Sequence, residues 1–250
     1  MMLRSMFATV LVLLIACNKA PKPLRVVTAG GNGPTTFVLL HGFGSNAERW
    51  LPFANAISLH VAKGQGQGHF VFPEGPFATT PPAGPKGGRA WWPLQLDSYI
   101  RSPGTLPNMS QASPVGIEDA ANRAGALLAS LNSGWLHKPK RTILGGFSQG
   151  AMVAMETLLT KAPKLDALVL LSGTLVNEAK WRTLYAAHKG LPVFIAHGRT
   201  DEVLPFALAE RMAQQLENAG LKVRWFPFEG GHEIPAEVVD ALNRFLITIP

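Results

Sequence analysis

The stretch Leu144–Gly150 reads LGGFSQG, and it contains a Gly-X-Ser-X-Gly pentad centred on Ser148. An apolar run typical of a buried strand, Thr142–Leu144, leads into the pentad, and an apolar helical pattern, Ala151–Thr160, follows it. Where a strand, a sharp turn and a helix meet at such a pentad, the serine hydroxyl is held above the carboxyl edge of a parallel sheet. The alternative is a serine that only caps a helix after a glycine turn. The local sequence favours a parallel α/β fold with a functional serine at its edge.

Short apolar runs and helical patterns alternate on both sides of this stretch. The runs typical of buried strands are Thr36–Leu40, His69–Phe72, Thr142–Leu144, Ala167–Leu171, Pro192–Ala196 and Val223–Phe228, with Leu24–Thr28 as a candidate edge strand. The helical patterns cover Glu48–Val61, Gly116–Leu131, Gln149–Thr160, Glu178–His188, Phe206–Ala219 and Pro235–Ile247. This alternation predicts a mostly parallel, twisted sheet with helices on both faces, in one domain over residues 24–250.

The segment Pro73–Pro114 does not follow the pattern. It carries nine prolines and five glycines with no clear periodicity, which predicts an irregular loop of unusual length. Trp91 and Trp92 lie within it, and two interpretations of these large aromatic residues stay open. They can pack onto the core beneath the loop, they can line a pocket that binds the substrate, and both roles can hold together.

The N-terminal residues are typical of a targeting signal. A basic residue precedes an apolar run that has the length of a signal-peptide core and is too short to span a bilayer. The only cysteine of the chain, Cys17, ends the sequence Leu14–Cys17, LIAC, which resembles the bacterial lipobox. We expect residues 1–16 to be removed and Cys17 to carry acyl chains, with residues 17–23 as a tether. The protein would then be anchored in the bacterial cell envelope, with the outer membrane favoured; an ordinary secretory signal is the alternative.

A serine hydroxyl becomes an effective nucleophile only when a base takes its proton. Of the seven histidines, His232 follows the last predicted strand in a glycine-rich loop, at the same sheet edge as Ser148. Asp201 follows the preceding predicted strand, where a carboxylate can orient the imidazole. The order Ser148, Asp201, His232 is that of α/β-hydrolases. Glu202 and the more distant Glu178 are rival acids, and a solvated loop carboxylate is the plain alternative for Asp201.

The tetrahedral intermediate of acyl transfer needs hydrogen-bond donors aimed at its oxyanion. We expect one donor to be the backbone N–H of Gln149, directly after the nucleophile. The other is expected to be the N–H of Phe43, in the glycine-rich loop that follows Thr36–Leu40, although a plain glycine turn is the alternative. His41 and His197 also lie near this edge, and we assign them structural roles.

Six segments occur in this order along the chain: LHGFG (40–44), FPEGP (72–76), RAWW (89–92), LGGFSQG (144–150), HGRTD (197–201) and GH (231–232). Their sequences and their order resemble the phospholipase/carboxylesterase family, which includes the acyl-protein thioesterases. The resemblance implies a compact α/β-hydrolase fold without a large cap domain. It also implies hydrolysis of carboxylic esters or thioesters with no cofactor and no metal. The family's triad falls on Ser148, Asp201 and His232, and its oxyanion donors fall on Phe43 and Gln149.

Composition and charge limit the other classes of function. The chain is 47% hydrophobic and 16% charged, which excludes a disordered, collagen-like or coiled-coil protein. The formal net charge of +7 is not accompanied by a basic stripe or a nucleic-acid motif. We therefore expect no nucleic-acid partner. The resemblance implies a small-molecule ester or thioester as substrate, and we expect its acyl group to be small to medium. Two alternatives stay open: an esterase that acts on extracellular polymer or feruloyl esters, and a hydrolase fold that serves only as a binding module.

Overall fold

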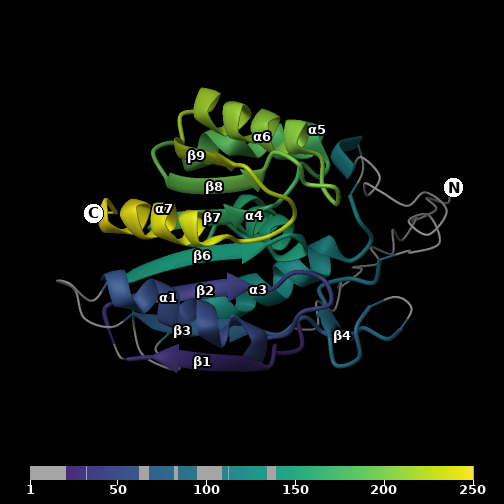
Figure 1. The fold of residues 1–250 in the computed structure, drawn as a ribbon, viewed down its shortest axis with the longest axis vertical. Helices are drawn as coiled ribbons and strands as arrows, with labels where there is room; N and C mark the ends of the chain where they lie inside the picture. Colours follow the sequence, from purple (N-terminus) through teal and green to yellow (C-terminus); the bar gives the residue numbers. More distant parts are fainter. Residues whose placement is uncertain are drawn as a thin grey trace, which may run out of the picture.

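The computed structural model describes residues 21–31, 33–61, 68–81, 84–94, 109–111, 113–133 and 139–249. The expected signal sequence and Cys17 lie outside these residues. Within them, no helix is both long enough and apolar enough to cross a membrane. A sheet with the strand order β1-β3-β2-β6-β7-β8-β9 runs through the molecule (Figure 1). Its strands are β1 (Val26–Gly30), β2 (Thr35–Leu40), β3 (His69–Pro73), β6 (Arg141–Phe147), β7 (Ala167–Leu171), β8 (Pro192–Gly198) and β9 (Lys222–Phe228).

The prediction of a mostly parallel sheet is confirmed. Every neighbouring pair from β3 to β9 is parallel, and only β1, at one edge, runs antiparallel to β3. The alternation of side chains along each strand divides the core in two. In β2, Val38 and Leu40 join one buried cluster, whereas Phe37 and Leu39 join the other. Both faces of the sheet are therefore apolar, and both need helices to cover them.

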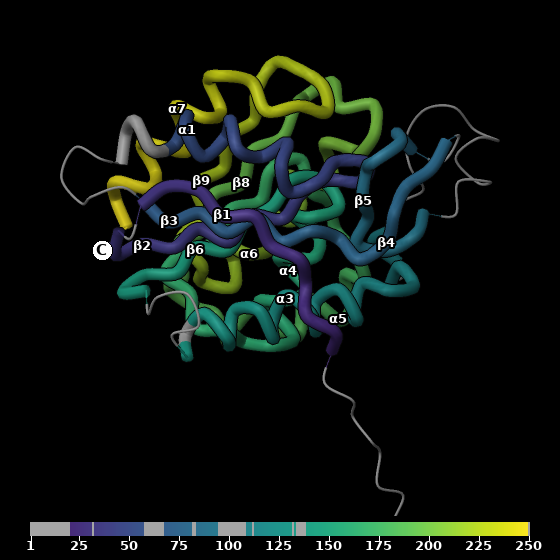
Figure 2. Tube along the Cα trace, turned by 90° about the horizontal axis from the view of Figure 1, so that it is seen from below, coloured from purple at the N-terminus to yellow at the C-terminus, as the bar shows by residue number. Residues whose placement is uncertain are grey.

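The helices cover the two faces unequally. In Figure 2, α1 (Leu51–Val61) and α7 (Ala236–Ile247) lie on one side of the sheet. The opposite side carries α3 (Ile117–Asn132), α4 (Gln149–Lys161), α5 (Glu178–Leu184) and α6 (Phe206–Asn218). A 3-10 turn, Tyr185–His188, continues α5, so the expected single helix over these residues is split by a tighter last turn.

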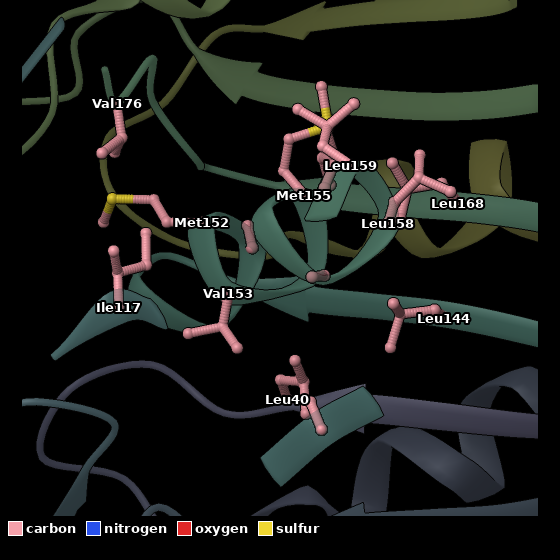
Figure 3. Packing of buried hydrophobic residues seen from close by; sticks show 14 of the residues in the cluster. Leu40, Ile117, Leu144, Met152, Val153, Met155, Leu158, Leu159, Leu168 and Val176 are labelled. Carbon is pink, nitrogen blue, oxygen red and sulfur yellow. The ribbon is translucent and has the colours of Figure 1, made fainter. Parts of the chain in front are cut away.

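Helix α4 is the most deeply buried of these helices, and it carries the pentad at its start. Eleven of its residues, Gln149 to Leu159, are buried. Figure 3 shows Val153 facing Leu40 and Leu144 of the strands beneath it, while Met152 lies near Ile117 and Val176 from other segments. A helix with apolar contacts around most of its circumference is held firmly in place. The N-terminus of α4, next to Ser148, is therefore a fixed point of the structure.

The segment after β3 contains more regular structure than we expected. Two short strands, β4 (Phe77–Ala78) and β5 (Arg89–Ala90), pair antiparallel, and a 3-10 turn forms at Met109–Gln111. Strands of this length are too short to show a period of two in the sequence. The expectation of an irregular loop over the whole of Pro73–Pro114 is therefore wrong for these short elements, whereas the other described residues from Glu74 to Pro114 belong to no helix or strand.

A buried histidine fixes the loop that follows β2. His41 is 1% exposed, and its Nδ1 lies 2.7 Å from the carbonyl oxygen of Gly42, which can only accept. Its Nε2 accepts a hydrogen bond from the Gly75 N–H at 2.9 Å, so the single ring proton is on Nδ1. Burial lowers the pKa of His41 to about 4. The ring is therefore neutral, as its two hydrogen bonds require, and the structural role assigned to His41 is confirmed.

We expect this histidine to make the folded protein less stable in acid. Between its ordinary pKa of 6.5 and its folded pKa of about 4, the unfolded chain binds a proton that the folded protein does not. On account of this group, the free energy of unfolding should fall by about 3 kcal/mol between about pH 7.5 and about pH 4. Denaturant unfolding over this pH range measures the effect.

The matched variant is His41→Asn, which keeps a donor near the Gly42 carbonyl but does not titrate. Its unfolding free energy should depend less steeply on pH than that of the unaltered protein. The same pH dependence in both proteins would contradict the assignment of a neutral, buried His41.

Candidate active site

Ser148 lies in a strained turn between β6 and α4. Its φ of 54° and ψ of −119° fall in a region that L-residues rarely adopt. The flanking glycines provide the space for this turn. A Cβ on Gly146 would lie 2.4 Å from the Gly150 carbonyl oxygen, and a Cβ on Gly150 would lie 2.1 Å from that of Leu40. Neither position accepts a larger residue, and the predicted strand, sharp turn and helix are confirmed.

The loop after β2 passes directly beside this turn. A Cβ on Gly42 would lie 2.9 Å from the Phe147 ring and 3.3 Å from the Cβ of Ser148. In the part of the chain that the structure describes, neither the Phe43 N–H nor the Gln149 N–H donates to a protein acceptor. The Gln149 N–H belongs to the first turn of α4, where the helix dipole favours negative charge. Two unpaired backbone donors therefore belong to the segments that border the serine.

A close approach also brings together the loops that follow β8 and β9. A Cβ on Gly198, at the end of β8, would lie 2.3 Å from the carbonyl oxygen of Gly230. The Thr200 N–H donates to the same oxygen at 3.0 Å. This contact sets Asp201 beside His232, although 31 positions separate them in the sequence.

A chain of hydrogen bonds joins the three side chains that the sequence selected. His232 Nδ1 lies 2.7 Å from Asp201 Oδ2, and His232 Nε2 lies 2.8 Å from Ser148 Oγ. Because the ionised carboxylate only accepts, the imidazole proton is on Nδ1, and Nε2 accepts the hydrogen bond from the serine hydroxyl. The arrangement is that of a nucleophile, a base and an acid that orients the base.

The Asp201 carboxylate is buried but well supplied with donors. Its Oδ1 accepts hydrogen bonds from the N–H groups of Val203 and Leu204, each at 2.8 Å, and its Oδ2 lies 3.2 Å from His197 Nε2. Burial alone disfavours the charge, but hydrogen bonds from His197, His232 and Leu204 outweigh it. The pKa of Asp201 therefore lies well below its usual range. The carboxylate stays ionised at every pH at which the base is useful.

The contact between His197 and Asp201 was not anticipated from the sequence. His197 is 0% exposed at the end of β8, and its Nε2 faces both the carboxylate and the Leu204 carbonyl oxygen, the latter at 3.0 Å. The sequence feature that could have indicated this contact is the spacing of four positions between His197 and Asp201, which a turn can bring together. The rival acids lie elsewhere, since Glu202 is exposed and Glu178 pairs with Arg211 at 2.8 Å.

The two tryptophans are in the core. Trp91 is 0% exposed and Trp92 is 2% exposed, and both belong to the buried apolar cluster that includes α4. In this conformation neither ring is accessible to a substrate. The structure therefore supports the packing interpretation. That these rings also line a substrate pocket stays a prediction. Their polar groups are used instead for contacts with the site loops, because the Trp91 indole N–H donates to the His41 carbonyl oxygen at 2.8 Å.

Among the described residues, no group of three or more histidine, cysteine, aspartate or glutamate side chains is arranged to hold a metal ion. What the site can do chemically follows from its own side chains: a hydroxyl next to a base, and unpaired N–H groups close by.

The chain is similar in sequence to a family of known proteins. The family model described as Phospholipase/Carboxylesterase matches residues 22–249. Acyl-protein thioesterase 1 of Eremothecium gossypii is 25% identical over 238 residues, which span 91% of this chain and 93% of that protein. The protein of the same name from Yarrowia lipolytica is 27% identical over 240 residues, 89% of this chain and 96% of its own.

Solved structures share the architecture. The crystal structure of esterase PE8 matches with a TM-score of 0.72 and 30% identity, and it covers 91% of this chain and 99% of its own. The Bacillus cereus carboxylesterase matches with a TM-score of 0.65 over 90% of this chain and 95% of its own; at 17% identity this likeness concerns the fold alone. The family model spans almost the whole chain. The chain therefore belongs to the phospholipase/carboxylesterase family, and it is a carboxylic ester hydrolase with an α/β-hydrolase fold.

Proposed function

We propose that this protein hydrolyses carboxylic esters and thioesters of small to medium acyl groups through a covalent acyl-enzyme on Ser148. The observation that carries the proposal is the uninterrupted chain of hydrogen bonds from Ser148 Oγ through His232 to Asp201, at 2.8 Å and 2.7 Å. A hydroxyl without such a base is a poor nucleophile. Membership of the family supports the reaction class, and these hydrogen bonds support the assignment of the three catalytic residues.

In the first half of the reaction, Ser148 Oγ attacks the acyl carbon and its proton passes to His232 Nε2. The ionised Asp201 stabilises the imidazolium that forms and keeps its ring in orientation. The carbonyl oxygen becomes an oxyanion, and the N–H groups of Phe43 and Gln149 donate hydrogen bonds to it. One such donor contributes about 3 kcal/mol to stabilisation of the transition state.

The first half ends when the tetrahedral intermediate collapses: the bond from the acyl carbon to the leaving oxygen or sulfur breaks, the imidazolium gives its proton to that atom, and the acyl group stays on Ser148. Water then attacks the acyl carbon while His232 takes one of its protons. The second tetrahedral intermediate collapses, the serine oxygen recovers the proton, and the carboxylic acid leaves. Each proton moves through one imidazole nitrogen, which requires Nδ1 to stay bound to the carboxylate.

Two observations bear on the substrate. Relatives over most of the chain are named acyl-protein thioesterases, and a structural relative is named an esterase, so both leaving groups fit the family. Trp91 and Trp92 are packed in the core, so they offer no exposed apolar wall to a long acyl chain. This favours short to medium chains.

We also propose that the enzyme works at a membrane of the bacterial cell envelope, held by acyl chains on Cys17. The support is the lipobox-like sequence that ends at the single cysteine. Only four steps along the chain separate Cys17 from Pro21, where the described structure begins. An extended chain of that length reaches about 14 Å. The catalytic domain would therefore stay close to the membrane surface, with the outer membrane favoured.

The nucleophile can be tested with a fluorophosphonate probe. We expect the native protein to be labelled and Ser148→Ala to remain unlabelled, with ester turnover at least about 1,000-fold lower, because Ser148 is the one hydroxyl of the described residues that is hydrogen-bonded to the base. The matched control is Ser172→Ala, a second buried serine with positive φ, which follows β7 at the same sheet edge. This control should keep its label. Equal labelling of Ser148→Ala and the native protein would defeat the proposal.

The acyl preference can be measured with p-nitrophenyl esters from acetate to palmitate, beside thioesters of the same acids. We expect kcat/KM to be greatest for butyrate or octanoate and about tenfold lower for palmitate, because the rings of Trp91 and Trp92 are buried and do not offer a longer chain an exposed apolar contact. A maximum at palmitate would overturn the size assignment. A polymer ester or a feruloyl ester that is cleaved better than every small ester would favour the alternative substrate class.

Anchoring can be tested by expressing the full chain in a bacterium fed with labelled palmitate. The unaltered protein should take up the label and sediment with membranes, whereas Cys17→Ser should not be labelled, because acylation needs the thiol. An unlabelled but catalytically active native protein would contradict the anchor without affecting the assignment of the reaction.

A further inference from the structure

The side chain of Gln149 has a task apart from its backbone. Its amide is buried, with 2% of the residue exposed. The Oε1 atom accepts a hydrogen bond from the Trp91 N–H at 2.9 Å, and Nε2 donates to the Trp92 carbonyl oxygen at 3.0 Å. The amide therefore forms hydrogen bonds with two main-chain groups, the N–H of Trp91 and the carbonyl oxygen of Trp92. It ties the turn that carries Ser148 to the segment that follows β5.

Trp91 continues this connection to the loop after β2. Its indole N–H donates to the His41 carbonyl oxygen at 2.8 Å, and its ring lies 5.3 Å from the imidazole, centroid to centroid. One residue thus bonds to Gln149 through its main chain and to His41 through its side chain. Gln149 carries one of the two backbone N–H groups that we assign to the oxyanion. His41 lies two residues before Phe43, which carries the other.

His41 determines where the neighbouring peptide group points. Its Nδ1–H donates to the Gly42 carbonyl oxygen at 2.7 Å, and the Ser45 N–H donates to the same oxygen at 3.2 Å. In a trans peptide the C=O and the following N–H point in opposite directions. Holding the Gly42 oxygen on the side of the imidazole therefore turns the Phe43 N–H to the other side, away from the buried ring.

We infer that Gln149, Trp91 and His41 form a buried brace that sets the separation and direction of the two oxyanion donors, the N–H groups of Gln149 and Phe43. The inference rests on the proposed function and deepens it. All three are positioning residues as regards their side chains, since each side chain is buried and bonds to main chain or to another member of the brace. The segment that follows β5 acts as the spacer between the two donors.

The two donors matter most when charge has developed on the substrate oxygen. A brace that positions them contributes little to binding of a neutral ester, and more to the tetrahedral stage. Loosening it should therefore lower kcat and leave KM almost unchanged. It should also weaken binding of a boronic acid, which forms a tetrahedral, anionic adduct with a serine. A residue that only stabilises the fold would not separate these quantities.

The test uses two variants that keep every backbone N–H. Gln149→Met preserves length and burial but loses both amide hydrogen bonds, and Trp91→Phe loses only the bond to His41. The matched control is Trp181→Phe, because Trp181 is also 0% exposed and its indole N–H is also hydrogen-bonded, to Glu156 at 2.6 Å. It lies in α5, outside the brace.

For Gln149→Met we expect kcat to fall by about 10- to 100-fold, with KM within about twofold and boronic-acid affinity reduced by a factor similar to kcat. Trp91→Phe should show the same pattern to a smaller extent, and Trp181→Phe should keep both values close to those of the native enzyme. If both brace variants match Trp181→Phe in kcat and in boronic-acid affinity, the brace is overturned.

Two precautions keep the result interpretable. If Gln149→Met fails to fold, Trp91→Phe decides the question alone, since it replaces one buried aromatic ring with another. An active Ser148→Ala would refute the proposed function, whereas an inactive Ser148→Ala beside fully active brace variants would refute the brace only.

Discussion

The approach of α4 to β2 at Gly150 is the constraint on which the site depends. A methyl group at this position would lie 2.1 Å from the Leu40 carbonyl oxygen, so the helix can sit this close only because the residue is glycine. Next to this contact Ser148 has a positive φ, and its Cβ would lie 3.3 Å from a Cβ on Gly42, in the loop that starts at His41. Apolar packing around α4 supplies the energy that holds the strained turn. The strained conformation of Ser148 therefore depends on the packing of the core around α4.

Of two buried titratable groups near this turn, one is charged and the other is neutral, and the difference lies in their partners. Asp201 receives N–H groups from the backbone and from two imidazoles, so its pKa is lowered and it is charged. His41 faces one acceptor and one donor, which suits a neutral ring, and burial lowers its pKa. Burial disfavours charge in both cases, and the number of donors aimed at the group decides the outcome. The site therefore has one fixed anion next to a base and a neutral ring under the opposite loop.

Much of this arrangement could be predicted from the sequence, because it follows from local patterns. Apolar runs and helical periodicity identified the parallel strands and their helices, and the order of Ser148, Asp201 and His232 placed three side chains at one sheet edge. The partners of Gln149 and His197 could not be predicted, since both depend on loops that meet only in the folded chain. Trp91 and Trp92 illustrate the same limit. Their burial depends on what covers them, and no local pattern records that.

The outer edge formed by β9 has a consequence for the way in which copies of this protein can meet. Lys222 N–H donates inward to Leu191, and alternation along the strand then turns the nitrogen of Pro227 to the outside. Lys222 and Arg224 add exposed positive charge to the same strand. A strand from a neighbouring copy would meet a missing donor and like charges, which makes edge-to-edge aggregation unfavourable. The β9 edge is therefore protected against pairing with a strand of another copy.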